Sequence, residues 1–172
     1  KPELRTELLD RVEKDQKARM ALLNWIKESG QSPDKLDKES DHPRLEALSR
    51  IDHENTKRLQ EIIEQVGWPG KSLVGEDGAH AAWLLLQHAD RAPAFQKTGL
   101  ELMKAAPAGE VMLQDVAYLT DRVSMKESGK QVYGTQVRQV DGKWQPQPLV
   151  DPDAVDKLRA EAGLPPMAQY LE

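Results

Sequence analysis

The sequence has no cysteine among its 172 residues, and this absence excludes several kinds of chemistry. Disulfides, thiolate metal sites and cysteine nucleophiles all require a thiol. Cysteine-free chains occur both among exported and among cytosolic proteins. The sequence starts at Lys1 rather than at Met, so we expect that an upstream segment was removed. Localisation therefore stays open, with a lean towards export.

Aromatic residues, long apolar runs and clustered positive charge are also scarce. One Phe and three Tyr leave aliphatic side chains and four Trp to fill the core. The longest helical apolar run, residues 81–86, is far shorter than the roughly 20 residues that span a bilayer, so we expect no membrane-spanning segment. The net charge is -5 and the cations are interleaved with acids, which argues against nucleic acid as a partner.

Helical periodicity dominates the rest of the sequence. A chain of this length is compatible with one core, so we predict a single domain over residues 1–172. The fold class that the pattern favours is mainly α, a bundle of five to six helices with a small β-hairpin near residues 131–149. The predicted helices cover residues 3–29, 44–66, about 78–90, 94–105, 110–123 and, from the Asp151-Pro152 start, up to Gly163.

Connections and strands follow from glycine, proline and alternation. We predict a loop over residues 31–43, a Gly-rich connection over 67–78, and an extended tail after Leu164. The hairpin prediction rests on alternation in residues 131–140, followed by Asp141-Gly142 as a two-residue turn.

The apolar stripe of the first predicted helix is interrupted by charge. Asp15 and Arg19 occupy stripe positions between Val12 and Leu22. Burying ionised groups costs several kcal/mol each unless they are paired. An ion pair between residues four apart on a solvated face is the simpler interpretation.

The second predicted helix repeats this interruption, with Asp52 and Asn55 in mid-stripe. If the two helices pack antiparallel, their midpoints lie level and these residues face Asp15 and Arg19. We therefore predict a polar layer in the bundle. The layer has two interpretations, a ligand site or a device that fixes helix register.

Other polar residues at apolar or inward positions complete the list of candidates. His88 lies on the apolar side of the third predicted helix, where a hydrogen-bonded core histidine is the commoner role. In the first strand, Gln136 shares a face with valines and needs partners, and Gly134 would allow a bulge or the close approach of a ligand.

The ordered motifs resemble those of a bacterial family known only as a domain of unknown function. They are DQKAR in the first helix, DHEN leading to GWP, then QHAD, YLTDRV, YGTQ and a C-terminal GLPPMAQYL. The resemblance implies a compact, mostly helical domain found in bacteria, with export signals in some members, and it implies no established activity. It draws attention to the motif positions Gln87, His88, Asp121, Arg122, Tyr133 and Gln136.

Two functions of different classes remain open. The first is a site for a small polar or anionic ligand, which could be hydrolysed or cleaved by acid/base chemistry. The alternative is a non-enzymatic interaction protein in which the layer only fixes register and surfaces such as Trp68 and Trp144 dock a partner. For the first function the candidate catalytic residues are His88, Asp52 and Asp121, and the candidate ligand-binding residues are Asp15, Arg19, Asn55, Gln87, Arg122, Tyr133 and Gln136.

Cofactor use and oligomeric state stay undetermined at this point. A variant with a metal held by Asp52, His88 and Asp121 is compatible with composition, but Arg19 nearby would repel a cation, so we predict no metal site. The sequence contains neither a P-loop nor a G-x-S-x-G motif.

Overall fold

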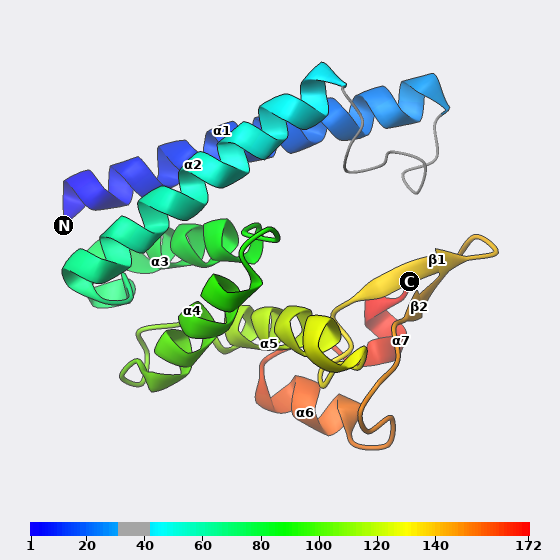
Figure 1. The fold of residues 1–172 in the computed structure, drawn as a ribbon. Coiled ribbons are helices and arrows are strands. Elements are labelled where there is room, and N and C mark those ends of the chain that lie inside the picture. The colour runs from blue at the N-terminus through cyan, green and yellow to red at the C-terminus, as the bar shows by residue number, and fades with distance from the viewer. Residues whose placement is uncertain (31–41) are drawn as a thin grey trace. The chain divides into compact units, whose positions relative to one another are not determined.

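The structure is a computed structural model that describes residues 1–30 and 42–172. Most of the loop predicted for residues 31–43 lies outside these residues. The chain forms two compact units, Lys1–Ala89 and Asp90–Glu172 (Figure 1). Its described residues are mainly helical with one small antiparallel hairpin, which confirms the predicted fold class.

Two long antiparallel helices, α1 (Pro2–Ser29) and α2 (Pro43–Val66), run along the first unit (Figure 1). Each begins with proline in its first turn, where the missing N–H costs nothing. The ring of His42 accepts a hydrogen bond from the backbone N–H of Arg44 and caps α2. Both helices match the predicted ranges, because their apolar stripes and glycine ends are unambiguous.

The third helix, α3 (Lys71–Gln87), packs against both α1 and α2. It begins at Lys71 and not near residue 78, so the prediction of a Gly-rich connection was wrong for residues 71–78. The glycines of this segment disfavour a helix, so the sequence predicted a connection here. Gly75, with φ 77°, does break the helical geometry within α3. The helix also ends at Gln87, before the predicted residue 90.

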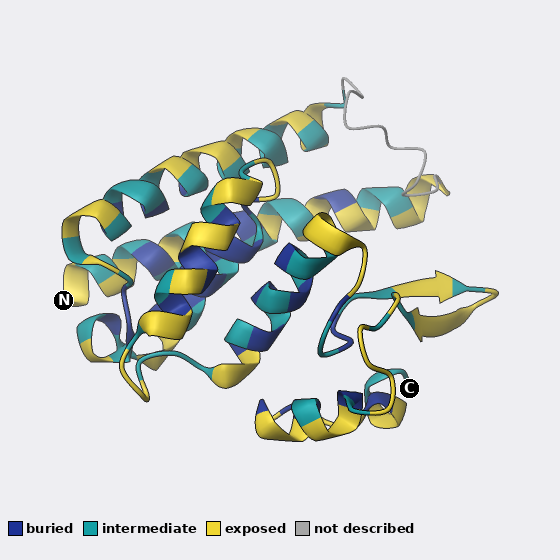
Figure 2. Ribbon diagram, turned by 60° about the horizontal axis from the view of Figure 1, so that its bottom comes forward, coloured by how far each residue is buried: buried dark blue, intermediate teal, exposed yellow. Residues whose placement is uncertain are grey.

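The core of the first unit lies where α3 meets the two long helices. The apolar face of α3 contributes most of it, as the dark blue positions in Figure 2 show. Leu8 from α1 and Leu59 from α2 are fully buried. The same buried faces also hold Asp15 and Asn55, so the predicted polar interruptions are real features of the packing.

The second unit begins with α4 (Pro93–Ala105) and α5 (Leu113–Ser128), which pack against each other. Helix α5 runs beyond the predicted Val123, because helix-forming residues continue up to the C-cap Gly129. Helix α6 (Val155–Glu161) starts later than predicted, since residues 151–154 form a turn around the side chain of Asp151. The predicted extended tail instead contains a short helix, α7 (Met167–Tyr170), which starts after Pro166.

The hairpin consists of β1 (Val137–Val140) and β2 (Lys143–Pro146), paired antiparallel around Asp141-Gly142 as predicted. Its first strand is shorter than the alternation suggested. Residues 131–136 form an irregular segment instead, with a bridge between Gln131 and Leu149. None of the described helices combines the length and apolar character that crossing a membrane requires.

Gly134 lies where the irregular segment passes close to α7. Its φ is 70°, and a Cβ atom at this position would lie 2.6 Å from the Sδ of Met167. We predict that Gly134→Ala lowers the free energy of unfolding by roughly 1–2 kcal/mol through its left-handed backbone, with displacement of Met167 added. Urea unfolding followed by far-ultraviolet circular dichroism measures this change. Gly129→Ala is the control with the same backbone strain and open space around the new methyl group, and an equal loss in both variants would contradict the close contact.

Candidate functional site

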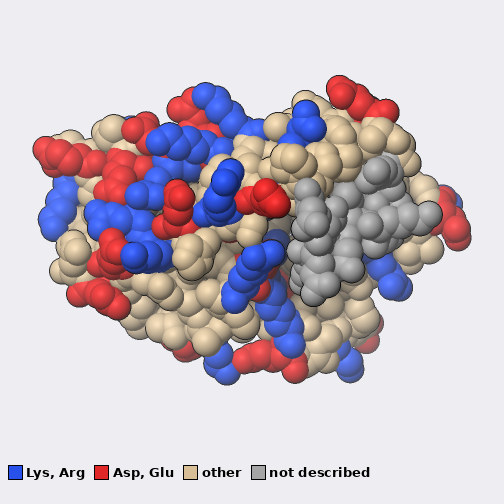
Figure 3. Space-filling model, turned by 45° about the horizontal axis from the view of Figure 1, so that its top comes forward, with Lys and Arg blue, Asp and Glu red and all other residues tan. Residues whose placement is uncertain are grey.

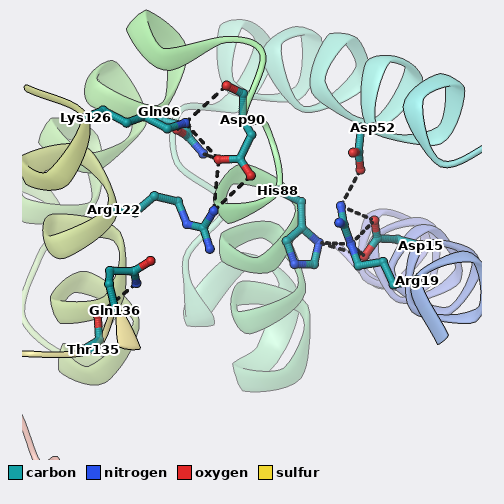
Figure 4. Close-up of polar contacts among 10 residues, drawn as sticks. All are labelled: Asp15, Arg19, Asp52, His88, Asp90, Gln96, Arg122, Lys126, Thr135 and Gln136. Carbon is teal, nitrogen blue, oxygen red and sulfur yellow. Dashed lines mark hydrogen bonds and ion pairs between the residues drawn. The ribbon is translucent and has the colours of Figure 1, made fainter. Parts of the chain in front are cut away.

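Four polar side chains from the three helices of the first unit meet in one cluster, which we call the Asp15–His88 cluster: Asp15 and Arg19 on α1, Asp52 on α2, and His88 at the C-cap of α3 (Figure 4). Antiparallel packing brings Asp52 level with the α1 pair, as the stripes predicted. Sequence reasoning grouped His88 with Asp52 and Arg19 in one candidate site, but it did not predict the contact of His88 with Asp15, because the position of α3 depends on tertiary packing.

The closest contact of His88 is with the carboxylate of Asp15. Its Nδ1 lies 2.8 Å from Asp15 Oδ2 and 3.0 Å from Arg19 Nε. Arg19 Nε always carries hydrogen and lies 3.1 and 3.2 Å from the two oxygens of Asp15. Nδ1 has two alternative roles here: unprotonated, it accepts the N–H of Arg19 Nε, and protonated, it donates to the Asp15 carboxylate, which is the shorter contact. In the tautomer that donates to Asp15, Nε2 is the unprotonated nitrogen, and it has no hydrogen-bond partner among the described residues.

Arg19 joins the two long helices by contacting a carboxylate on each. Its Nη2 lies 2.5 Å from Asp52 Oδ1 and 3.1 Å from Asp15 Oδ1. The side chain of Asp15 is fully buried, whereas those of His88, Asp52 and Arg19 are 17%, 23% and 25% exposed. The cluster thus has a buried anchor and three groups that solvent reaches.

The pKa values of the two aspartates move in opposite directions. Burial favours the protonated form of Asp15, but hydrogen bonds from His88 and Arg19 outweigh it and hold the pKa of Asp15 below its ordinary value. Burial, together with the neighbouring Asp15 carboxylate, raises the pKa of Asp52 to about 6 despite the attraction of Arg19. Near pH 6 the cluster therefore combines a fixed anion with a carboxyl that readily exchanges a proton.

Two predicted ligand residues of the first unit lie outside this cluster. Asn55 is buried, but its Oδ1 accepts a hydrogen bond from Arg11 Nη1 at 3.2 Å instead of meeting Arg19. Asn55 lies three residues after Asp52, on the same face of α2 but about one helical turn further along. Gln87 is buried in α3, directly before His88.

In the second unit, Asp121 organises the segment that follows α5. Its carboxylate is fully buried and accepts four hydrogen bonds of 2.7–2.9 Å, from the backbone N–H groups of Val132, Tyr133 and Thr135 and from the hydroxyl of Thr135. Three of these contacts hold backbone N–H groups, and the fourth holds the side chain of Thr135 in the same segment. This geometry gives the interpretation of Asp121 as a catalytic carboxylate no support.

The sequence profile of one protein family, with the description Family of unknown function (DUF6624), matches residues 2–172. The chain belongs to this family. The match spans both units and agrees with the resemblance that the ordered motifs indicated. Neither a curated protein nor a solved structure matches the DUF6624 chain.

The remaining motif residues of the DUF6624 chain are part of local networks in its second unit. Arg122 Nη1 lies 3.0 Å from both oxygens of Asp90, which also contacts Lys126 (Figure 4). The carbonyl of Tyr133 accepts a hydrogen bond from Arg159, and burial raises the pKa of the Tyr133 hydroxyl. Gln136 donates through Nε2 to Thr135 Oγ1 at 3.1 Å.

Sequence reasoning missed three fully buried polar residues in the described part of the DUF6624 chain, Gln96, Gln131 and Arg159. The predicted inward glutamine, Gln136, is only half-buried, and Gln131 has the structural role: its amide bonds the N–H and C=O of Gln136 and the C=O of Gln147. No periodic signal marks Gln131, because the segment is irregular. Arg159 lies one turn after buried Val155, so its stripe position was a usable signal.

The alternative with a metal has no geometric basis in the described part of the DUF6624 chain. Among the described residues, no group of three or more His, Asp or Glu side chains could hold a metal ion. Asp52 and His88 approach Asp15, but the Arg19 guanidinium lies among them and repels cations.

Proposed function

We propose that the Asp15–His88 cluster is an acid/base site that binds a small polar or anionic substrate and hydrolyses or cleaves it. The observation that carries this proposal is the 2.8 Å contact between Asp15 Oδ2 and His88 Nδ1, which orients the ring and, in the tautomer with Nδ1 protonated, leaves Nε2 as the basic nitrogen. A carboxylate that fixes a histidine tautomer in this way is a recurrent device for general-base catalysis.

The surrounding groups suit complementary roles. Asp52, with its pKa raised to about 6, would donate a proton to a leaving group. Arg19 uses Nε and Nη2 on the two aspartates, while its Nη1 makes no hydrogen bond to the described residues. That N–H group would bind the anionic part of a substrate and stabilise developing negative charge. Asp15 is fully buried and contacts both His88 and Arg19, so we assign it the role of a positioning residue.

Stability alone gives no reason for such a cluster at the packing of three helices. Apolar replacements of buried ion pairs are often neutral or stabilising by 1–4 kcal/mol. A specific observation nonetheless favours the alternative, in which the cluster only fixes helix register. Its contacts link α1 to both α2 and α3. In that alternative a partner would dock elsewhere, for example at Trp144, which is half exposed, and less readily at the more buried Trp68.

The experiment is a thermal-shift screen of the protein against sugar phosphates, nucleotides, amino acids and peptidoglycan fragments, followed by mass spectrometry of each hit for breakdown. A compound that binds the folded state raises the melting temperature. We predict that His88→Gln lowers turnover of such a hit by at least about 100-fold, the usual contribution of general acid/base catalysis, while the melting temperature without ligand changes little.

His53→Gln provides the matched control, because His53 is exposed on α2. It should behave like the wild type in both binding and turnover. Equal turnover in His88→Gln and His53→Gln would refute the catalytic role of His88. Loss of stability in His88→Gln without any ligand or turnover in the wild type would favour the register alternative.

A further inference from the structure

A cavity of about 480 Å³ lies along the two long helices, and the proposed chemistry does not use it. We call it the α1–α2 groove. Its volume falls within the roughly 300–1,000 Å³ typical of small-molecule sites. The α1 side contributes Glu3, Thr6, Glu7, Asp10, Arg11 and Lys14, and the α2 side contributes Ile51, Glu54 and Asn55.

Asn55 gives this groove a buried polar group with unused hydrogen-bonding capacity. The residue is only 5% exposed, and its Nδ2 has no hydrogen-bond partner among the described residues. The amide cannot simply be turned over, because Oδ1 accepts a hydrogen bond from Arg11 Nη1 and a flipped amide would set two donors against each other. Leaving a buried donor unpaired costs about 1–3 kcal/mol. Nδ2 is closed to solvent in this structure, so a ligand oxygen reaches it, and recovers this free energy, only after a shift of the neighbouring side chains.

The charges around Asn55 are of both signs and only partly paired. Glu7 is bound by Arg58 at 2.7 Å and by Arg11 at 3.1 Å, so its carboxylate is satisfied. Among the described residues, Asp10 and Glu54 form no ion pair. Figure 3 shows this interleaving of acidic and basic side chains over the two long helices. The groove thus offers free carboxylates beside a buried N–H donor.

We propose that the α1–α2 groove binds a zwitterionic small molecule of the amino-acid class. The ligand carboxylate accepts hydrogen bonds from Asn55 Nδ2, beside the guanidinium of Arg11. Its ammonium group lies against the carboxylates of Asp10 and Glu54. This site differs from the Asp15–His88 cluster, shares no residue with it, and does not depend on its acid/base function.

Isothermal titration calorimetry with three sets of probes tests the assignment. The probes are the free L-amino acids, their N-acetyl derivatives, which lack the cation, and their methyl esters, which lack the anion. We expect at least one free amino acid to bind, with both of its derivatives at least tenfold weaker. Absence of binding by every free amino acid, or equal binding of a derivative, would overturn the proposal.

Variants locate the binding. Asn55→Leu, which keeps the branching of the side chain, should weaken it at least tenfold, because it removes the buried unpaired donor together with the acceptor of Arg11. The double variant Asp10→Asn, Glu54→Gln should do the same and alters only exposed side chains. Glu64→Gln, an exposed acid on α2 outside the groove, and His88→Gln should bind like the wild type. Wild-type affinity in both groove variants would exclude the groove, whatever the outcome for the acid/base site.

Discussion

Asp121→Ala is expected to lower the free energy of unfolding by about 3–5 kcal/mol, the largest stability effect that we predict. The substitution removes a carboxylate that accepts four hydrogen bonds in a fully buried position. Hydrogen bonds to a charged group contribute about 1.5–3 kcal/mol each and are not additive, and three backbone N–H groups would lose their acceptor. Urea unfolding, followed by far-ultraviolet circular dichroism, measures the loss.

Amide hydrogen exchange adds a local measurement of the same change. The N–H groups of Val132, Tyr133 and Thr135 should exchange much faster in Asp121→Ala than in the wild type, since their acceptor is gone. Asp153→Ala, an exposed aspartate of the same unit, is the control and should leave both measurements unchanged. A loss below about 1 kcal/mol with unchanged exchange would show that Asp121 is free for another role.

Asp52→Asn is expected to remove a pH dependence of stability between pH 4 and pH 6. The pKa of Asp52 is raised from its ordinary 3.8 to about 6, so the folded chain binds this proton more tightly than the unfolded chain. The wild type therefore loses stability as the pH rises through this window, by up to about 3 kcal/mol at about 1.4 kcal/mol per pH unit. Above pH 6 the variant should be the more stable protein, because Asn does not ionise.

Urea unfolding at intervals of half a pH unit from pH 3.5 to pH 7.5 gives the slope of the unfolding free energy against pH for the wild type and for Asp52→Asn. Asp15 contributes with the opposite sign: its lowered pKa stabilises the folded state above its ordinary pKa, and this stability is lost as the pH falls through the lower, folded pKa. The contribution of Asp15 therefore lies at the acidic end. Asp153→Asn is the control and should follow the wild-type curve. If the stability of Asp52→Asn changed with pH in parallel with that of the wild type, Asp52 would titrate as an ordinary aspartate.

The sequence predicted the first unit better than the second, and the reason is periodicity. Asp15 and Arg19 interrupt a clear stripe, as does Asp52, and antiparallel packing of two equal helices is enough to bring them together. The contact of His88 with Asp15 needed the position of α3, which no local pattern specifies. Its glycine-rich beginning even disguised where that helix starts.

Irregular backbone explains most of what the sequence could not predict in the second unit. Alternation in residues 131–136 favoured a strand, but the N–H groups of Val132, Tyr133 and Thr135 bond to Asp121 and that of Gln136 to the amide of Gln131. When side chains, and not a neighbouring strand, accept the backbone N–H groups, the spacing of hydrophobic residues gives no sign of it. The expectation of a single domain over residues 1–172 stays a prediction beside the two compact units.

The contact between α7 and the segment after α5 sets an order for biosynthesis. Met167 packs on Gly134, and the hydroxyl of Tyr170 donates to the carbonyl of Thr135 at 3.0 Å. Tyr170 also lies over the guanidinium of Arg159, 4.6 Å from the ring centre. These partners follow the rest of the second unit in the chain, whereas the helices α1 to α3 precede it and are synthesised before it. During translation the first unit can therefore fold while the second still waits for its final turn of helix.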